Sequence, residues 1–170
     1  MKISGRLICG PENIWNALYQ AAAESERMDI CSYWAGTGMK ALELLHTHRN
    51  SRIIVGGLSQ DEKVKAISMA HAVRNIGGRV AYLEGCHIKL YIFHQKWHSI
   101  AFLGSMNLGQ GMRYELLVKM DKDASHEATC YFNNLWHIAE PVNATVLRDV
   151  RLSLATAVFE QKATDQSQKP

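Results

Sequence analysis

The sequence has no long hydrophobic run. No stretch of its 170 residues approaches the ~18 consecutive apolar residues that suggest a membrane-spanning helix. The opening residues, MKISGRLICGPEN, carry no apolar segment behind their lysine and do not resemble a secretory signal. These absences favour a cytoplasmic protein that does not act at a membrane.

The sequence also gives no sign of disulfides, and it has no large excess of charge of one sign. The four cysteines are far apart and lie in apolar surroundings, which indicates buried free thiols: Cys9, Cys31, Cys86 and Cys130. The formal net charge of +3 is mildly basic, which is compatible with a polyanionic partner without identifying one. With 47% hydrophobic and 21% charged residues, the composition is that of an ordinary globular protein.

No internal repeat or linker interrupts the chain. We expect one domain over residues 1–160 and a flexible polar tail over 161–170. The first half alternates between helical and strand-like segments, which suits parallel crossover connections. The predicted helices cover 12–27, 39–48 and 59–78, and the predicted strands cover 28–34, 52–57 and 79–83.

The pattern changes after residue 85. Three strands are predicted in quick succession at 87–93, 99–104 and 114–120, with 94–98 as a hairpin loop. Two amphipathic helices follow, one over 124–139 and one starting near Asn143. Together the two halves predict an α/β fold in which a mixed parallel and antiparallel sheet is flanked by helices.

Polar side chains follow the predicted strands of the second half. Residues two apart on a strand face the same way, so His87 and Lys89 should project from one face. Ser105 and Asn107, again two apart, follow the next strand, and Glu115 opens the third. If the three segments are neighbours in the sheet, these five side chains converge at one edge.

This set of side chains suits chemistry at a phosphate. A histidine can act as a nucleophile or proton donor near neutral pH. Lysine and asparagine donate hydrogen bonds to the non-bridging oxygens, where charge grows in the transition state. A glutamate can fix the tautomer of the imidazole. No carboxylate cluster of the kind that holds magnesium lies nearby, so we expect no metal and no other cofactor.

The segments HIK at 87–89 and GSMN at 104–107, followed by Glu115, resemble the His-x-Lys motif of the phospholipase D superfamily. Order, spacing and strand context match, and the resemblance covers roughly residues 28–140. It implies the α-β-α sandwich of that superfamily.

One position departs from the family pattern. The family usually has an aspartate where this chain has His94. That aspartate is thought of as supporting the structure rather than attacking phosphorus, and we therefore interpret the substitution as compatible with activity.

The resemblance implies a two-step phosphodiesterase. One His87 would attack phosphorus to form a phosphohistidine, a second histidine would protonate the leaving oxygen, and water would release the product. Two motifs are needed and the chain has one, so the site should form across a symmetric homodimer. Each subunit would contribute His87, Lys89, Asn107 and Glu115 as catalytic residues. Lys89, Asn107 and Ser105 would bind substrate, although the Ser105 hydroxyl could instead bond the local turn.

Small single-motif members of this family are typically homodimeric nucleases. The resemblance therefore favours a metal-independent endonuclease that acts on nucleic acid, on DNA in preference to RNA. Two other functions stay open. One is a phospholipid phosphodiesterase, and the other is a nucleic-acid-binding module that keeps the phosphate pocket without turnover.

Two further groups of residues have structural explanations that we favour. Cys86, His94 and His98 lie within thirteen residues and invite a zinc site, but Cys86 should point into the core, opposite to His87. Tyr33 and Trp34 could line a cleft and stack on a base, but core packing is the simpler interpretation.

Overall fold

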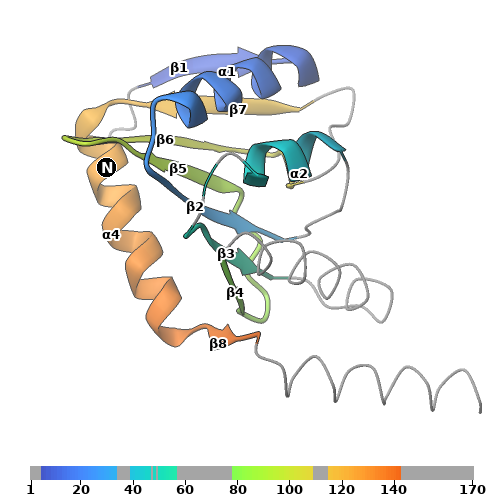
Figure 1. Ribbon diagram of the computed structural model, residues 1–170, viewed down its shortest axis with the longest axis vertical. Coiled ribbons are helices and arrows are strands. Elements are labelled where there is room, and N and C mark those ends of the chain that lie inside the picture. The colour runs from blue at the N-terminus through green and yellow to red at the C-terminus, as the bar shows by residue number, and fades with distance from the viewer. Residues whose placement is uncertain are drawn as a thin grey trace, which may run out of the picture.

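The computed structural model describes residues 5–33, 39–46, 48, 50–56, 78–108 and 115–142. These residues form an eight-stranded sheet in the order β1-β7-β6-β5-β2-β3-β4-β8 (Figure 1). The strands are β1 (Gly5–Cys9), β2 (Arg27–Ser32), β3 (Arg52–Val55), β4 (Arg79–Tyr82), β5 (Leu90–His94), β6 (Ser99–Gly104), β7 (Leu116–Met120) and β8 (Glu140–Pro141). The helices are α1 (Pro11–Ala23), α2 (Met39–His46) and α4 (Lys122–Ile138).

The sheet is mixed, as the sequence predicts. Strands β2, β3 and β4 run parallel, which fits their long connections. The pairs β2–β5, β5–β6, β6–β7 and β7–β1 are antiparallel. A tight turn over 95–98 joins β5 to β6, with the Gln95 N–H donating to the His98 carbonyl at 2.8 Å.

Two hydrophobic cores lie on opposite faces of the sheet. Helices α1 and α2 cover one face and α4 covers the other (Figure 1). Side chains alternate between the two cores along each central strand. In β5, Tyr91 and Phe93 pack in the core with α1 and α2, whereas Leu90 and Ile92 pack in the core with α4. The arrangement is the α-β-α sandwich that the family resemblance implies.

Local sequence explains where the two long helices begin and what they bury. Helix α1 starts at Pro11, and it buries Ile14, Leu18 and Ala21 on one side. Helix α4 starts after Asp121, whose carboxylate accepts a hydrogen bond from the Ala124 N–H at 2.9 Å. These features confirm the predicted helices over 12–27 and 124–139, with bounds that shift by a few residues.

Strand β5 starts three residues later than predicted. The sequence predicts a strand from His87, but β5 begins at Leu90, so His87 and Lys89 precede the strand. The neighbouring β2 explains this, because its ladder with β5 extends only to the pair Cys31–Leu90. His94 correspondingly belongs to β5, not to the hairpin loop.

Strand β1 was not predicted. It is a short edge strand whose residues are mostly exposed, so it lacks the apolar pattern that marks a buried strand. The predicted helices over 59–78 and from Asn143, and the tail over 161–170, lie outside the described residues. None of the helices described here is long and apolar enough to cross a membrane.

A buried carboxylate joins three elements at the centre of the sheet. Asp29 on β2 is fully buried, and both its oxygens accept hydrogen bonds from Arg52 on β3, at 2.8 and 2.6 Å. His94, at the position where the family usually has an aspartate, lies 2.6 Å from the same carboxylate. Arg52 also donates to Asn133 on α4 and packs against the ring of Phe132.

The partners of Asp29 keep it ionised. Burial alone would raise the pKa of this carboxyl, but the hydrogen bonds and charges of Arg52 and His94 outweigh burial. The pKa of Asp29 therefore lies below its ordinary value of 3.8. The ionised Asp29 carboxylate and its partner Arg52 thus hold β2 and β3 together.

Replacing Asp29 with asparagine should lower the free energy of unfolding by about 3–5 kcal/mol at pH 7, because Arg52 would remain buried without its counter-charge. Urea unfolding followed by circular dichroism measures this. The matched control is Glu127→Gln, which removes an exposed carboxylate on α4 and should change the value by less than about 0.5 kcal/mol.

The pH dependence gives a second test of the same interaction. Because the folded-state pKa of Asp29 is lowered, its contribution is present above about pH 4 and is lost as the pH falls further. In Asp29→Asn, the part of the fall in the free energy of unfolding below about pH 4 that is due to Asp29 should be absent. Equal stability of the two proteins at pH 7 would contradict the role assigned to the pair.

Candidate active site

The predicted site residues lie where several strands end at one edge of the sheet. Strands β5, β6 and β7 are neighbours, which confirms the condition on which their convergence depends. Strand β2 lies next to β5 and ends at this same edge with Ser32. Three parts of the chain therefore lie at this edge: the segment before β5, the loop after β6 and the residue before β7.

His87 and Lys89 lie together on the segment that leads into β5. The His87 ring stacks on Tyr33, with 3.8 Å between ring centroids and 20° between planes. The Lys89 ammonium donates to the His87 carbonyl at 2.7 Å and lies 5.6 Å from the Tyr33 ring centroid. His87 is exposed, so its imidazole is accessible to a substrate.

Tyr33 differs from the expectation of core packing. It is half-buried and belongs to neither hydrophobic core, and it packs against His87 instead. Stacking of this kind restricts the plane of the imidazole. Trp34, the other aromatic residue of that prediction, lies outside the described residues.

Asn107 is held by the end of β2. Its side-chain oxygen accepts a hydrogen bond from the Ser32 hydroxyl at 3.3 Å, and the same hydroxyl accepts the Leu108 N–H at 2.9 Å. Sequence reasoning missed Ser32, although a buried serine at the end of an apolar strand was the available signal. Its hydroxyl links β2 to the loop that carries Asn107.

Tyr91 supports the same loop from β5. It is fully buried, and its hydroxyl donates to the Met106 carbonyl at 2.9 Å. Burial, and then the negative charge of Glu115, raise the pKa of Tyr91. The phenol therefore stays protonated and keeps its hydrogen bond to the loop.

Ser105 and Glu115 form a separate pair. The Ser105 hydroxyl donates to the Glu115 carboxylate and accepts the Leu116 N–H at 3.1 Å. This contact closes the loop from β6 to β7 locally, as the alternative role for Ser105 predicts. Among the described residues of this chain, no hydrogen bond joins Glu115 to His87.

Cys86 and Gly56 fix the segment that precedes β5. Cys86 and Cys31 are buried in the core under α4, as predicted. Cys9 on the edge strand β1 and Cys130 on α4 are exposed, so the prediction of burial is wrong for these two. A Cβ atom on Gly56 would lie 1.8 Å from the Cys86 carbonyl oxygen, so the end of β3 and this segment are in direct backbone contact. Within the described part of the chain, no three histidine, cysteine or acidic side chains group to hold a metal ion.

Replacing Ser32 with alanine should lower the free energy of unfolding by about 1–3 kcal/mol, because it leaves the buried Leu108 N–H without an acceptor. Denaturant unfolding measures the change. The control Thr129→Ala removes a hydroxyl that donates to the Ser125 carbonyl within α4, and it should cost less than about 0.5 kcal/mol. Similar values for the two variants would show that Ser32 does not hold the loop.

Comparison with known proteins gives matches in structure and none in sequence. No family model matches the sequence, and no curated protein matches it. NucT from Helicobacter pylori superposes with a TM-score of 0.66 at 18% identity, over 82% of this chain and 99% of NucT. Nuc from Salmonella typhimurium, a phospholipase D family member, has a TM-score of 0.65 at 12% identity, over 84% of this chain and 100% of Nuc.

A third similar structure belongs to a larger protein. TrmBL2, an archaeal chromatin protein, superposes with a TM-score of 0.55 at 14% identity, over 81% of this chain and 54% of TrmBL2. At these identities the comparisons concern the fold. The chain therefore has the fold of the phospholipase D superfamily, as its motif at 87–89 and 104–107 predicts.

Proposed function

We propose that this protein is a metal-independent phosphodiesterase of the cytoplasm that cuts nucleic acid, as a DNA endonuclease, at a site shared by a homodimer. The observation that carries the proposal is the exposed His87 imidazole beside Lys89, at the edge of the sheet where Asn107 is also held. No hydrogen bond engages the His87 ring among the described residues, so both ring nitrogens can serve a substrate.

The reaction needs only side chains of this motif. The neutral imidazole of one His87 attacks phosphorus, a phosphorus–nitrogen bond forms, and the bond to the leaving oxygen breaks. The partner's His87, protonated, gives that oxygen its proton and then takes one from the water that releases the product. Lys89 has two N–H groups left after its bond to the His87 carbonyl, and these stabilise the charge on the non-bridging oxygens.

The homodimer follows from counting the groups that the reaction uses. The chain has a single His-x-Lys motif, whereas attack and protonation use two histidines. A two-fold axis beside the exposed His87 would bring both together, because an isologous interface places the same residues on both sides. Glu115, which bonds Ser105 within the chain, would meet an imidazole only when such a site assembles.

Two observations support the preference for DNA. The net charge is +3, and one similar structure, TrmBL2, is an archaeal chromatin protein whose structure shows a mode of DNA binding. These features favour nucleic acid over lipid as the source of the phosphodiester.

Plasmid and single-stranded DNA should be cleaved by the wild type in excess EDTA, because no step uses a metal. His87→Ala should lower the rate by about 10³-fold or more, since it removes both nucleophile and proton donor. The control is His98→Ala, which removes an exposed histidine at the far end of the sheet and should leave the rate unchanged. Equal cleavage by wild type and His87→Ala would remove His87 from the mechanism.

Mixing wild type with His87→Ala under conditions of subunit exchange tests the shared site. If each dimer holds one site that needs both histidines, an equal mixture should have about a quarter of the activity of wild-type protein at the same total concentration. Independent sites in each subunit would retain about half. Size-exclusion chromatography with light scattering measures the dimer, and co-purification of untagged wild type with affinity-tagged His87→Ala shows that subunits have exchanged. After exchange, a linear dependence of activity on the wild-type fraction would exclude the shared site.

A further inference from the structure

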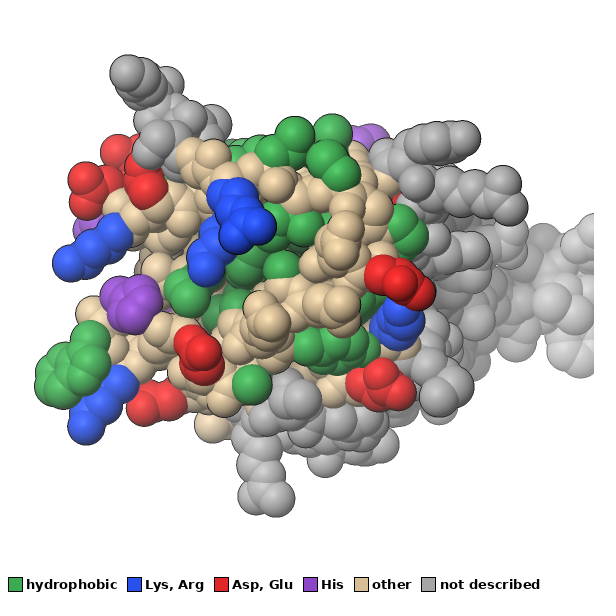
Figure 2. Space-filling view, turned by 90° about the horizontal axis from the view of Figure 1, so that it is seen from above, with side chains coloured by type: hydrophobic (Ala, Val, Ile, Leu, Met, Phe, Trp, Pro, Cys, Tyr) green, Lys and Arg blue, Asp and Glu red, His purple; other side chains and the backbone are tan. Residues whose placement is uncertain are grey.

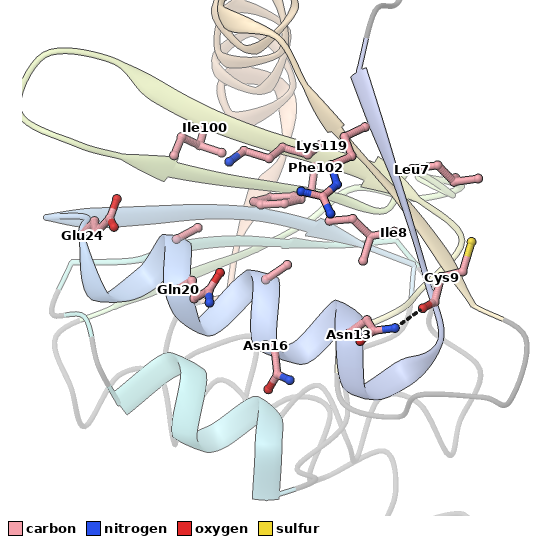
Figure 3. Close-up of a pocket in the computed structure, with 13 residues that line it drawn as sticks. Leu7, Ile8, Cys9, Asn13, Asn16, Gln20, Glu24, Ile100, Phe102 and Lys119 are labelled. Atoms are coloured by element: carbon pink, nitrogen blue, oxygen red, sulfur yellow. Dashed lines mark hydrogen bonds between the residues drawn. The ribbon is translucent and has the colours of Figure 1, made fainter.

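A groove separate from the His87 edge runs between α1 and the outer strands β1, β7 and β6 (Figure 3). Its volume is about 470 Å³. Phe102 on β6 lies on its floor, and Lys119 reaches across this floor from β7. On the face seen from above in Figure 2, basic side chains stand beside a hollow with hydrophobic side chains on its floor.

Two cations lie side by side on the wall of the groove that the sheet forms. Arg6 on β1 and Lys119 on β7 are direct partners in the antiparallel ladder, and both line the groove. Side chains at such positions start about 5 Å apart, and like charges placed there destabilise a sheet. Neither cation has a salt bridge or a hydrogen bond within the described residues. An anion between them would remove the repulsion.

The helix side of the groove offers further hydrogen-bond donors. Asn16 and Gln20 on α1 are exposed and line the groove with amide groups. One acidic residue, Glu24, lines it at the far end, and its carboxylate already accepts a hydrogen bond from Gln95 at 3.0 Å. The groove is therefore polar and positive in the part that Arg6 and Lys119 share.

One end of the groove lies near Glu115 of the candidate active site. Cys9, which lines the groove, pairs with Leu116, and the following Gly10 N–H donates to the Glu115 carbonyl at 3.2 Å. From Glu115 to Lys119 there are four residues of strand, a distance of about 13 Å. About four stacked nucleotides of a single strand span that length, at about 3.4 Å each.

We propose that the Arg6–Lys119 groove binds a backbone phosphate of the nucleic-acid strand whose scissile phosphate lies at His87. This inference rests on the proposed function and adds to it a second phosphate contact away from the cut. Arg6 supplies a planar donor fork and Lys119 a point charge, a combination suited to a phosphodiester without base recognition. The groove thus increases affinity for long strands and leaves sequence unread.

The test compares a long and a minimal substrate. In Arg6→Gln/Lys119→Gln, KM for a 12-nucleotide single strand should rise about tenfold with kcat unchanged, because the groove contacts the strand equally before and during reaction. Hydrolysis of bis(p-nitrophenyl) phosphate, which is too short to reach the groove, should stay at the wild-type rate. The matched control is Lys96→Gln/Lys122→Gln, which removes the same charge elsewhere on the surface.

Binding gives an independent readout. In a His87→Ala background, fluorescence anisotropy with the 12-mer should show a salt dependence whose log–log slope is smaller by about 0.7 in the groove variant, for the one phosphate contact that is lost. The control double variant should keep the slope. A melting temperature at or above that of the wild type confirms that each variant folds.

The outcomes separate the two proposals. If the wild type cleaves the 12-mer and the groove variant matches the control variant in KM and slope, the groove proposal fails and the nuclease proposal stands. If the wild type cleaves neither the 12-mer nor bis(p-nitrophenyl) phosphate, the proposed function fails. If the groove variant instead loses binding only to phosphatidylserine vesicles, the groove is a lipid site and the nucleic-acid assignment is overturned.

Discussion

The buried ion pair between Asp29 and Arg52 is the constraint on which the centre of this fold depends. A charged carboxylate in the middle of a sheet is stable only with a partner in good geometry. A one-residue slip of β2 would move Asp29 to the opposite face, away from Arg52 and His94. The pair therefore selects the register of β2 against both β3 and β5, and through Asn133 it also positions α4.

That register decides which polar groups meet at the edge. Three residues beyond Asp29, the chain reaches Ser32, whose hydroxyl binds both Asn107 and the loop backbone at Leu108. The ladder between β2 and β5 ends at the pair Cys31–Leu90, which releases the segment carrying His87 and Lys89 from the sheet. The position of His87 thus depends on where the ladder between β2 and β5 ends. The buried charge of Asp29 helps to fix that end, although it lies three residues, about 10 Å, before Ser32 along β2.

The sequence predicted what local pattern determines and missed what distant contacts determine. Alternation and turn residues located β6 at 99–104 and the hairpin before it, and the spacing of His87, Lys89 and Asn107 predicted one shared edge. The ion pair joins residues 23 positions apart, and no local pattern marks such a partner. Strand β1 was missed because an exposed edge strand buries too little apolar surface to show a periodicity.

At the edge of the sheet that β1 forms, two cations, Arg6 on β1 and Lys119 on β7, lie side by side, and their closeness needs an explanation. Charges on edge strands prevent pairing with other sheets, and this accounts for Arg6. It does not account for Lys119, because β7 is an interior strand that pairs with both β1 and β6. Protection of the edge needs one charge on β1 and gains nothing from a second, repelling charge on β7. The pair is better explained by an anion that both side chains share, in a groove that α1 completes.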